Sequence, residues 1–456
     1  MAELFPYQVE GVEFLRQRSR AYLADEMGLG KSVQLIRASQ GKTLVIAPAM
    51  LLDTGTWQGE IDKWADDPSR FTLASYSHIP SRRGNKTSVV PRDEYLQAWD
   101  TVILDEAHYL KNRDAIRTRA VMRVLKGIPR VYMASGTPIP NWAHELFVPL
   151  QILWPDEARS GMRFGSYWRW VDQWFVTSPS RYARGATEIG RLRGTRARNN
   201  PDHCPHYQRF FEENFGDKFL MRRRDEVLTD LPSLTEETIP VPMTARQWKE
   251  YRRMRDEYIA EVADDTVVAW SSGARHSMLD RITTSLGALS DNPLEESGKF
   301  LQLEEDLSAR QRPTLVAAHY QKTVEACGEV ARNLGRTTGV IHGGTPPAER
   351  ARLVKAFQAG DLDVLVGSVE TIAEGLTLTR ADVLILVEVS YRPSKNEQVI
   401  RRIHRIGQTR GCYVRDYVAT GPRGQKTLDG SKRALLERKI DGQQSVLRAS
   451  EFKEML

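Results

Sequence analysis

Cysteine is scarce in this sequence. Only Cys204, Cys327 and Cys412 occur in 456 residues, and no two of them form a CxxC pair. The sequence therefore carries no disulfide framework and is typical of a protein from a reducing compartment. His203 and His206 flank Cys204, but one cysteine with two closely spaced histidines makes a poor zinc site, so a surface loop is the better interpretation.

Long hydrophobic runs are also missing. The longest lies around Leu44 to Leu52, contains Pro48 and is too short to span a bilayer. The first residues, MAELFPYQVEGVEF, are acidic and interrupted by Pro6, unlike a secretory signal peptide. The sequence thus gives no reason to expect insertion into a membrane.

The composition is that of a folded chain with a small excess of positive charge. Hydrophobic residues make up 41% of it and there are 10 tryptophans, which argues against global disorder. The length predicts about three ordinary domains or two large ones. A net charge of +6 favours a polyanionic partner such as nucleic acid, although an ordinary basic soluble protein explains the charge equally well.

A glycine-rich stretch near the N-terminus reads LADEMGLGKSVQ. Gly28 and Gly30 allow the backbone to curl so that several N–H groups point into one concavity, which suits a triphosphate at the start of a helix. Lys31 would then reach the β- and γ-phosphates, and Ser32 would hold Mg²⁺. The strict phosphate-loop pattern has a glycine where this chain has Asp25, so a turn that caps an ordinary helix stays open as an alternative.

Short apolar runs with strand character recur along the chain, separated by segments of helix or loop length. This alternation predicts an α/β fold with parallel sheets, which bind ligands at the carboxyl ends of their strands. The second half has no phosphate loop of its own, so it need not bind nucleotide alone. The predicted strands are 43–47, 101–104 and 130–134 in the first half, and 314–318, 339–341, 364–367, 383–387 and 413–417 in the second.

Polar residues follow two of the predicted strands. Asp105 and Glu106 come directly after TVIL; there a carboxylate can hold Mg²⁺ through water, and Glu106 can polarise the attacking water. Ser135 and Thr137 follow the next strand and can sense the γ-phosphate and relay its presence to the second half. The alternatives are an acidic helix N-cap for the carboxylates and a simple turn for the hydroxyl residues.

The middle of the chain changes character. Tryptophans crowd between residues 154 and 175 and predict a helical hydrophobic patch. The arginine-rich stretch 181–209 predicts an exposed loop that either touches phosphates or is merely solvated. Three prolines between 232 and 242 predict a linker, and a polar helix is predicted from 245 to about 263.

Two helices carry further candidate residues. In the predicted helix 4–15, the Gln8 amide offers both a donor and an acceptor and can read an adenine edge, whereas a plain exposed glutamine is the alternative. The stretch NEQVIRRIHRIGQT predicts a helix with Gln398, Arg402 and Arg405 on one face. Guanidinium groups there suit the transition-state charge of phosphoryl transfer, and an ordinary basic helix is the alternative.

These motifs carry a family resemblance. LADEMGLGKSVQ, DEAH, SGTPIPN, VIHGGTPPAERARLVKAF and EQVIRRIHRIGQTR occur in the order found in superfamily-two helicases. More narrowly, the chain resembles Swi/Snf-type double-stranded-DNA translocases. Relatives that unwind RNA usually end the last motif with Gly-Arg, whereas here Gly407 is followed by Gln408.

The resemblance implies two RecA-like lobes, each a parallel sheet flanked by helices, with ATP and Mg²⁺ between them. It implies lobe 1 at 1–154, a helical and loop insertion at 155–235, lobe 2 at 236–420 and a C-terminal helical extension at 421–456. Nucleotide binding falls to Gln8, Gly28, Gly30, Lys31, Ser32 and Gln398, metal binding to Ser32 and Asp105, catalysis to Lys31, Glu106, Arg402 and Arg405, coupling to Ser135 and Thr137, and nucleic-acid contact to Gly343, Gly344, Thr371 and Gly375.

The expected activity is ATP-dependent translocation by a monomer along the backbone of double-stranded DNA, without sequence readout. The expected location is a bacterial or viral-host cytoplasm, or the nucleus if the source is eukaryotic. One rival is a strand-separating DNA or RNA helicase, which would need a wedge hairpin that only 155–235 could hide. The other is a non-catalytic scaffold, which the intact Lys31, Asp105, Glu106, Arg402 and Arg405 disfavour.

Overall fold

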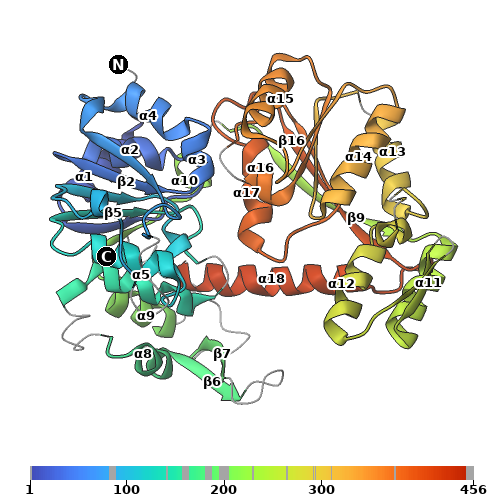
Figure 1. Ribbon diagram of the computed structural model, residues 1–456, viewed down its shortest axis with the longest axis horizontal. Coiled ribbons are helices and arrows are strands. Elements are labelled where there is room, and N and C mark those ends of the chain that lie inside the picture. The colour runs from blue at the N-terminus through green and yellow to red at the C-terminus, as the bar shows by residue number, and fades with distance from the viewer. Residues whose placement is uncertain are drawn as a thin grey trace. The chain divides into compact units, whose positions relative to one another are not determined.

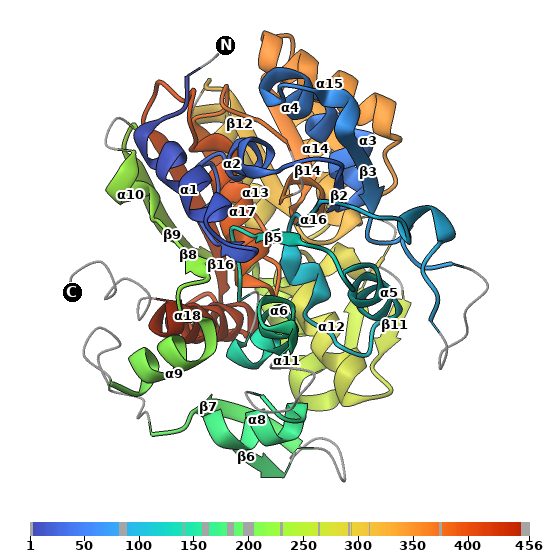
Figure 2. The same ribbon diagram turned by 90° about the vertical axis from the view of Figure 1, so that its left-hand side faces the viewer.

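The computed structural model of this chain divides into two compact units (Figures 1 and 2). Unit 1 comprises Met1–Thr229 with Lys439–Leu456, and unit 2 comprises Asp230–Arg438. The residues that the structure describes are 3–81, 89–139, 142–156, 164–179, 187–194, 205–228, 231–262, 265–290, 292, 294–309, 311–373 and 376–447.

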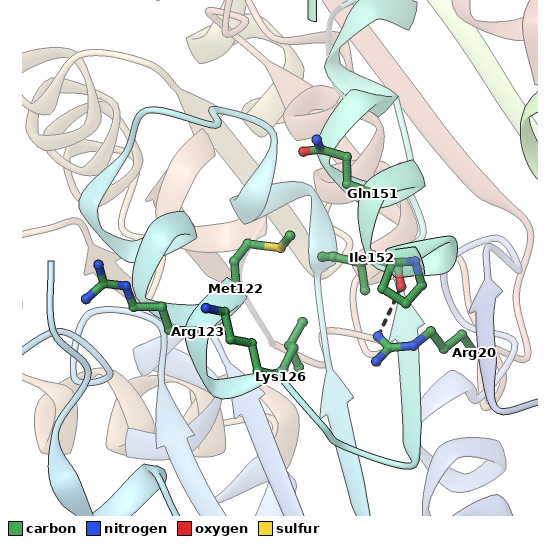
Figure 3. Close-up of a pocket in the computed structure, with 8 residues that line it drawn as sticks. Arg20, Met122, Arg123, Lys126, Gln151 and Ile152 are labelled. Atoms are coloured by element: carbon green, nitrogen blue, oxygen red, sulfur yellow. Dashed lines mark hydrogen bonds between the residues drawn. The ribbon is translucent and has the colours of Figure 1, made fainter. Parts of the chain in front are cut away.

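Unit 1 is built on a six-stranded sheet in the order β3-β2-β4-β5-β1-β8, in which every neighbouring pair is parallel. The strands are β1 Arg20–Leu23, β2 Thr43–Ala47, β3 Phe71–Ser75, β4 Thr101–Leu104, β5 Arg130–Ala134 and β8 Phe219–Leu220. Where β1 begins, a cavity of about 260 Å³ opens (Figure 3); it is lined by Arg20, Met122, Arg123, Leu125, Lys126, Gln151, Ile152 and Pro155.

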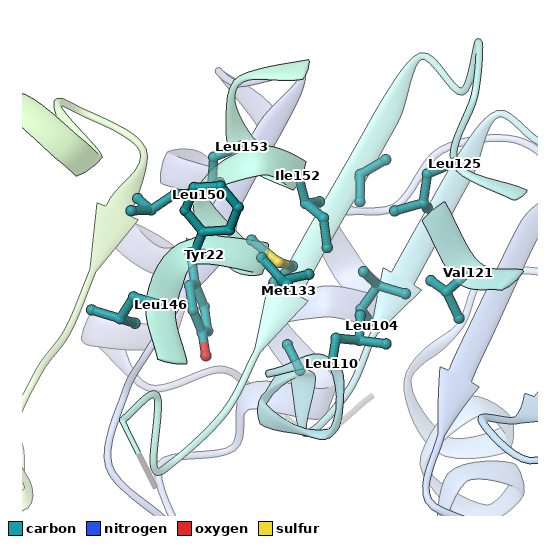
Figure 4. Close-up of a cluster of buried hydrophobic side chains, with 14 of the residues drawn as sticks. Tyr22, Leu104, Leu110, Val121, Leu125, Met133, Leu146, Leu150, Ile152 and Leu153 are labelled. Atoms are coloured by element: carbon teal, nitrogen blue, oxygen red, sulfur yellow. The ribbon is translucent and has the colours of Figure 1, made fainter. Parts of the chain in front are cut away.

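Alternate residues of these strands enter two separate cores. Tyr22, Leu104 and Met133 pack into one cluster (Figure 4), while their neighbours Leu23 and Ile103 pack into the other. A parallel sheet needs helices on both faces because each connection must return to the starting edge. Helices α1 Pro6–Arg16, α2 Lys31–Ala38 and α4 Thr56–Trp64 supply the second core, and α5 Ile116–Val124 and α6 Phe147–Leu153 supply the first.

Of the predicted insertion 155–235, residues up to Thr229 belong to this unit rather than standing apart from it. Its Trp170 and Phe210 belong to the same buried cluster as the sheet residues, and β8 completes the sheet. The exposed-loop prediction for 181–209 is wrong over Thr187–Leu192, which pairs with Phe175–Pro179 as an antiparallel hairpin, and from Pro205 on, where α9 begins. The elements of this segment are α8 Tyr167–Trp174, β6 Phe175–Pro179, β7 Thr187–Leu192, α9 Pro205–Phe215 and α10 Arg224–Val227.

Unit 2 repeats the architecture with a parallel sheet in the order β13-β14-β12-β15-β16-β9. The predicted linker is wrong, because β9 pairs with β16 along its whole length, from Leu234 to Pro242. An edge strand tolerates proline since one side of its backbone needs no partner. The strands are β9 Leu234–Pro242, β12 Thr314–Ala318, β13 Thr338–Ile341, β14 Val364–Ser368, β15 Val383–Leu386 and β16 Cys412–Thr420.

Helices again cover both faces of this sheet. One core contains Phe300 and Cys327 from α13 Gly298–Ala309 and α14 Gln321–Asn333. The other contains Phe357, Ile372 and Val399 from α15 Pro347–Ala359, α16 Val369–Ala373 and α17 Pro393–Ile403.

A smaller cluster joins the remaining elements of unit 2. They are α11 Ala245–Glu257, β10 Ile259–Val262, β11 Asp265–Val268 and α12 Ser272–Ile282, together with α18 Leu428–Leu447, whose residues up to Arg438 belong to unit 2. The helix predicted from 245 stops at Glu257 because Tyr258 adopts a left-handed φ of 66° and starts a hairpin. Unit 2 also has a short 3₁₀ turn at Leu286–Leu289. The shorter elements of unit 1 are helix α3 Ala49–Asp53 and the 3₁₀ turns Pro68–Arg70, Asp93–Tyr95, Ala107–Leu110 and Ala143–Leu146.

The predicted α/β class with two RecA-like parallel sheets is confirmed. Four of the predicted strands, 43–47, 101–104, 130–134 and 314–318, coincide with β2, β4, β5 and β12 at both ends. No helix in the described part of the chain is both long and apolar enough to cross a membrane.

Candidate nucleotide site

Three motif loops meet at one edge of the unit 1 sheet. The glycine-rich loop follows β1, Ser135 follows β5 and Asp105 follows β4. Because β4, β5 and β1 are neighbours in the sheet and all run parallel, their carboxyl ends and the motifs lie side by side. The cavity of Figure 3 includes the first residue of β1 and therefore lies away from this edge.

The glycine-rich loop is curled, as predicted. Gly28 and Gly30 have φ of 91° and 70°, and α2 begins at the next residue, Lys31. A Cβ on Gly30 would lie 2.4 Å from Nε2 of Gln8. The left-handed φ and this close approach both favour glycine between this loop and helix α1.

The Lys31 side chain folds back over the glycine-rich loop. Its Nζ donates to the carbonyl oxygens of Asp25 at 2.8 Å and Glu26 at 3.2 Å. Burial lowers the pKa of Lys31, while the surrounding carboxylates, Glu106 foremost, oppose that shift. Lys31 is thus a desolvated ammonium with several carboxylates nearby. Such a site can take up an anion at the ammonium together with a cation at the carboxylates.

Gln8 is not an exposed surface glutamine, and that alternative is wrong. The side chain is 5% exposed. Its amide oxygen accepts from the Phe5 backbone N–H at 3.1 Å, and Nε2 donates to the Leu29 carbonyl at 3.2 Å. The amide thus lies against the glycine-rich loop, where an adenine edge would compete with these two bonds.

Asp25 stands where the strict phosphate-loop pattern has a glycine. Its partner in the structure is Arg222, a residue that sequence reasoning missed. Asp25 is fully buried and accepts from Arg222 Nε at 3.0 Å, Arg222 Nη2 at 2.6 Å and Gln34 Nε2 at 3.1 Å. Arg222 lies just beyond β8 and also donates to the Tyr7 carbonyl. A buried aspartate requires such a partner, but nothing local in the sequence singles out Arg222.

The two carboxylates after β4 differ in environment. Asp105 accepts from the indole Nε1 of Trp57 at 2.8 Å and from the Glu106 backbone N–H at 2.9 Å. Burial and the neighbouring Glu106 charge raise the pKa of Asp105. Burial also disfavours the Glu106 carboxylate, but His108 and Lys31 outweigh it and lower its pKa. Glu106 is thus the carboxylate that stays ionised as pH falls.

Ser135 connects the loop after β5 to these carboxylates. Its hydroxyl donates to Glu106 Oε2 at 3.1 Å, lies 2.9 Å from Nδ1 of His108 and accepts from the Thr137 N–H at 3.1 Å. The Thr137 hydroxyl oxygen is buried, and no described residue bonds to it. This orphaned hydroxyl, the curled loop and the Ser32–Asp105 donor set fit ATP with Mg²⁺ held partly through water.

In unit 2 the predicted arginines do not share a helix. Arg402 lies in α17 and donates to the Ala373 carbonyl. Helix α17 ends at Ile403, so Arg405 lies in the following turn and donates to the Thr377 hydroxyl at 3.1 Å. The prediction of one helical face is therefore wrong beyond Ile403, although Gln398 lies on the helix and is buried.

Gln408 fixes that turn. Its Nε2 lies 3.0 Å from the Thr379 carbonyl, 2.9 Å from that of Ala381 and 3.0 Å from that of Ile403. Its Oε1 accepts from the next two backbone N–H groups at 2.9 and 3.0 Å. An arginine at this position has no acceptor for those two N–H groups.

The candidate nucleic-acid contacts differ in their exposure to solvent. Gly343 and Gly344 lie in an exposed turn after β13. Thr371 is 4% exposed and its hydroxyl accepts from Ser368 at 2.7 Å, so burial removes this hydroxyl from a surface contact, contrary to the prediction. Gly375 lies outside the described residues.

Metal clusters built from three or more His, Cys, Asp or Glu side chains are absent from the described residues. The predicted Mg²⁺ site would draw on one serine and one aspartate instead. His203 and Cys204, which form a poor zinc pattern, lie outside the described ranges.

Protein families match both halves of the chain. The SNF2-related domain family matches residues 7–90 and 70–289, more than half of the chain together. This chain belongs to the SNF2-related family. The family described as helicase conserved C-terminal domain matches residues 298–407. The predicted Swi/Snf-type membership is confirmed, and the chain is an enzyme of this helicase-like ATPase class.

Individual relatives of this SNF2-related chain are distant. It is 27% identical to human "DNA annealing helicase and endonuclease ZRANB3" over 96% of this chain and 40% of that protein. It is 27% identical to "Putative ATP-dependent helicase/translocase YwqA" of Bacillus subtilis (strain 168) over 92% of this chain and 46% of that protein. The chain thus spans less than half the length of either relative.

Among solved structures, the chain is similar to "Sulfolobus solfataricus SWI2/SNF2 ATPase core in complex with dsDNA". The two share 20% sequence identity, the match covers 98% of this chain and 97% of that one, and the TM-score is 0.41.

Proposed function

We propose that this chain is an ATP-driven motor that moves along double-stranded DNA without reading its sequence. The observation that carries the proposal is the hydrogen-bond chain from Thr137 through Ser135 to Glu106, at the strand ends that also hold the glycine-rich loop. Through these hydrogen bonds, a change in the nucleotide beside Glu106 can alter the loop after β5.

In unit 1, the proposed role of each residue follows from its position around the glycine-rich loop and the strand ends. ATP with Mg²⁺ supplies the γ-phosphoryl group and neutralises charge as it is transferred. Lys31 and Ser32, at the start of α2, would hold the phosphates and the ion, with Asp105 as the second metal-binding residue. Glu106, kept ionised beside His108, would accept a proton from the attacking water. Gln8 would receive the adenine edge.

In unit 2, Arg402 and Arg405 would supply positive charge to the transition state of a nucleotide held by unit 1. Each now donates to an acceptor within unit 2, so each must exchange that bond during the cycle. Exchange of a ground-state bond for one made only in the transition state raises turnover rather than affinity. Gln398 would support these arginines from the buried face of α17.

Duplex DNA is favoured as the track because Gln408 stands where relatives that unwind RNA usually have an arginine. One matched relative carries translocase in its name. Contact through the phosphate backbone predicts that affinity falls steeply with salt, by roughly 0.9 log units per log unit of salt for each phosphate contact. The exposed turn at Gly343 and Gly344 is the proposed contact among the described candidates.

A triplex-displacement assay run beside a fork-unwinding assay tests the proposal. Displacement of the third strand from a duplex, with duplex-stimulated ATPase and no unwinding of a plain fork, is the expected result. Glu106→Gln is the matched control, since it keeps the fold and should abolish displacement. Efficient fork unwinding with ATPase stimulated by single strands would overturn the translocase.

Strand separation is the second candidate function, and the β6–β7 hairpin is the feature that raises it. A wedge needs an inserted hairpin, and the described strands Phe175–Pro179 and Thr187–Leu192 pair antiparallel. The residues that join its strands read SRYARGA and lie outside the described ranges. They are basic rather than apolar, which suits contact with phosphate better than insertion between bases. The fork arm of the same experiment decides between the two functions.

A further inference from the structure

Trp57 lies beneath the metal-binding carboxylate that the proposed function requires. It belongs to α4 and to no nucleotide-binding motif identified in the sequence. Its side chain is 1% exposed, and its indole Nε1 donates to Asp105 Oδ2 at 2.8 Å. An indole is a donor only, so this bond has one possible direction.

The ring that carries this donor is held by the core. Trp57 belongs to the buried cluster that also contains Leu35, Ile61 and Ile103. Rotation of an indole within such packing requires a cavity and displaced neighbours. The packing of the ring therefore holds the N–H in the direction of Asp105.

The carboxylate is thereby fixed at both oxygens. The Glu106 backbone N–H holds Oδ1 at 2.9 Å and Trp57 holds Oδ2. Each oxygen keeps a free lone pair, so the plane of the carboxylate is set while its capacity to bind a cation or its water remains. Partners of this kind orient metal ligands in protein sites generally.

We propose that Trp57 is a positioning residue for the metal site: its indole holds Asp105 in the orientation that receives Mg²⁺. The inference rests on the proposed function, which assigns Asp105 to the metal. It predicts that loss of the N–H weakens the Mg²⁺-dependent part of nucleotide binding and leaves the Mg²⁺-independent part intact.

The test compares Trp57→Phe with Trp64→Phe in the full chain. Trp64 lies on the same helix, half-buried, with Lys63 Nζ 4.9 Å from its ring. Binding of a fluorescent ATP analogue is measured by anisotropy in EDTA and across a Mg²⁺ titration. Trp57→Phe should raise the half-saturating Mg²⁺ concentration by roughly 10-fold or more and leave affinity in EDTA unchanged, whereas Trp64→Phe should change neither.

A wild-type Mg²⁺ titration for Trp57→Phe overturns the inference, as does an equal loss of affinity with and without Mg²⁺, which would indicate a merely structural role. If Trp57→Phe does not fold, benzothienylalanine at position 57 keeps the ring shape and replaces N–H by sulfur. Asp105→Asn separates the two levels of the argument. If Asp105→Asn keeps Mg²⁺-dependent tightening, the metal assignment in the proposed function fails; if it loses tightening while Trp57→Phe keeps it, only the role of Trp57 fails.

Discussion

The buried ion pair at the glycine-rich loop offers a sharp test of how this site is held. Arg222→Met keeps an unbranched side chain and removes the guanidinium that donates to Asp25, to Gln34 and to the Tyr7 carbonyl. Asp25 is 0% exposed, so its carboxylate would keep the Gln34 amide as its remaining side-chain hydrogen-bond donor. Breaking a buried pair in this way costs about 3–5 kcal/mol.

Thermal unfolding of the nucleotide-free chain measures this loss. For a unit of this size, 1 kcal/mol shifts the midpoint by about 2–4 °C, so the unit 1 transition should fall by roughly 6–20 °C. The unit 2 transition should not move. Arg123→Met, at an exposed position of the same unit, should shift neither transition by more than about 1–2 °C.

The double variant Asp25→Asn with Arg222→Met decides the cause. Removing both charges leaves no unpaired ion, so it should recover most of the loss seen in the single variant. A shift below about 2 °C for Arg222→Met, or a double variant no more stable than the single, would refute the reasoning that pairing with Arg222 is what allows an aspartate at this loop position.

Other substitutions test the chemistry. Lys31→Ala should abolish ATP turnover because the phosphates lose their counter-charge; near-normal turnover in a folded variant would remove the phosphate-loop assignment. Glu106→Gln should bind ATP with affinity close to that of the unaltered chain and stop hydrolysis, as measured by analogue binding and phosphate release, and normal turnover would show that Glu106 is not the base. Arg402→Ala and Arg405→Ala should each slow hydrolysis by about 10³ or more with little loss of ATP affinity; normal rates in both would make them structural.

The central strands of both sheets could be predicted because they are buried along all or nearly all of their length. TVIL and TLVAA carry no outward-facing polar face, so an apolar run of strand length has one reasonable interpretation beside helix-length segments. β3 was missed because FTLAS lies at the sheet edge and is only partly buried. β9 reads as a linker because its prolines are tolerated at an edge, which is a property of topology rather than of local sequence.

The loops of the nucleotide site were predictable for a different reason. Glycine spacing and a lysine at a helix start are local, and the loop geometry follows from them. The residues that hold the loops in place are not local: Arg222 reaches Asp25 across 197 positions and Trp57 reaches Asp105 across 48. Many basic residues in the sequence could serve as the partner of Asp25, and only the folded structure shows which of them does.

The turn after α17 shows where periodicity stops being a sound guide. Counting at 3.6 residues per turn places Arg402 and Arg405 on one face, yet the helix ends between them. Gly407 adopts a φ of 96°, and Gln408 caps the Ile403 carbonyl and two carbonyls of a neighbouring segment. The position of Arg402 is therefore set by the helix, while that of Arg405 is set by Gln408. Two arginines proposed for one transition state thus depend on different supports, and a change at Gln408 should impair the role of Arg405 while sparing Arg402.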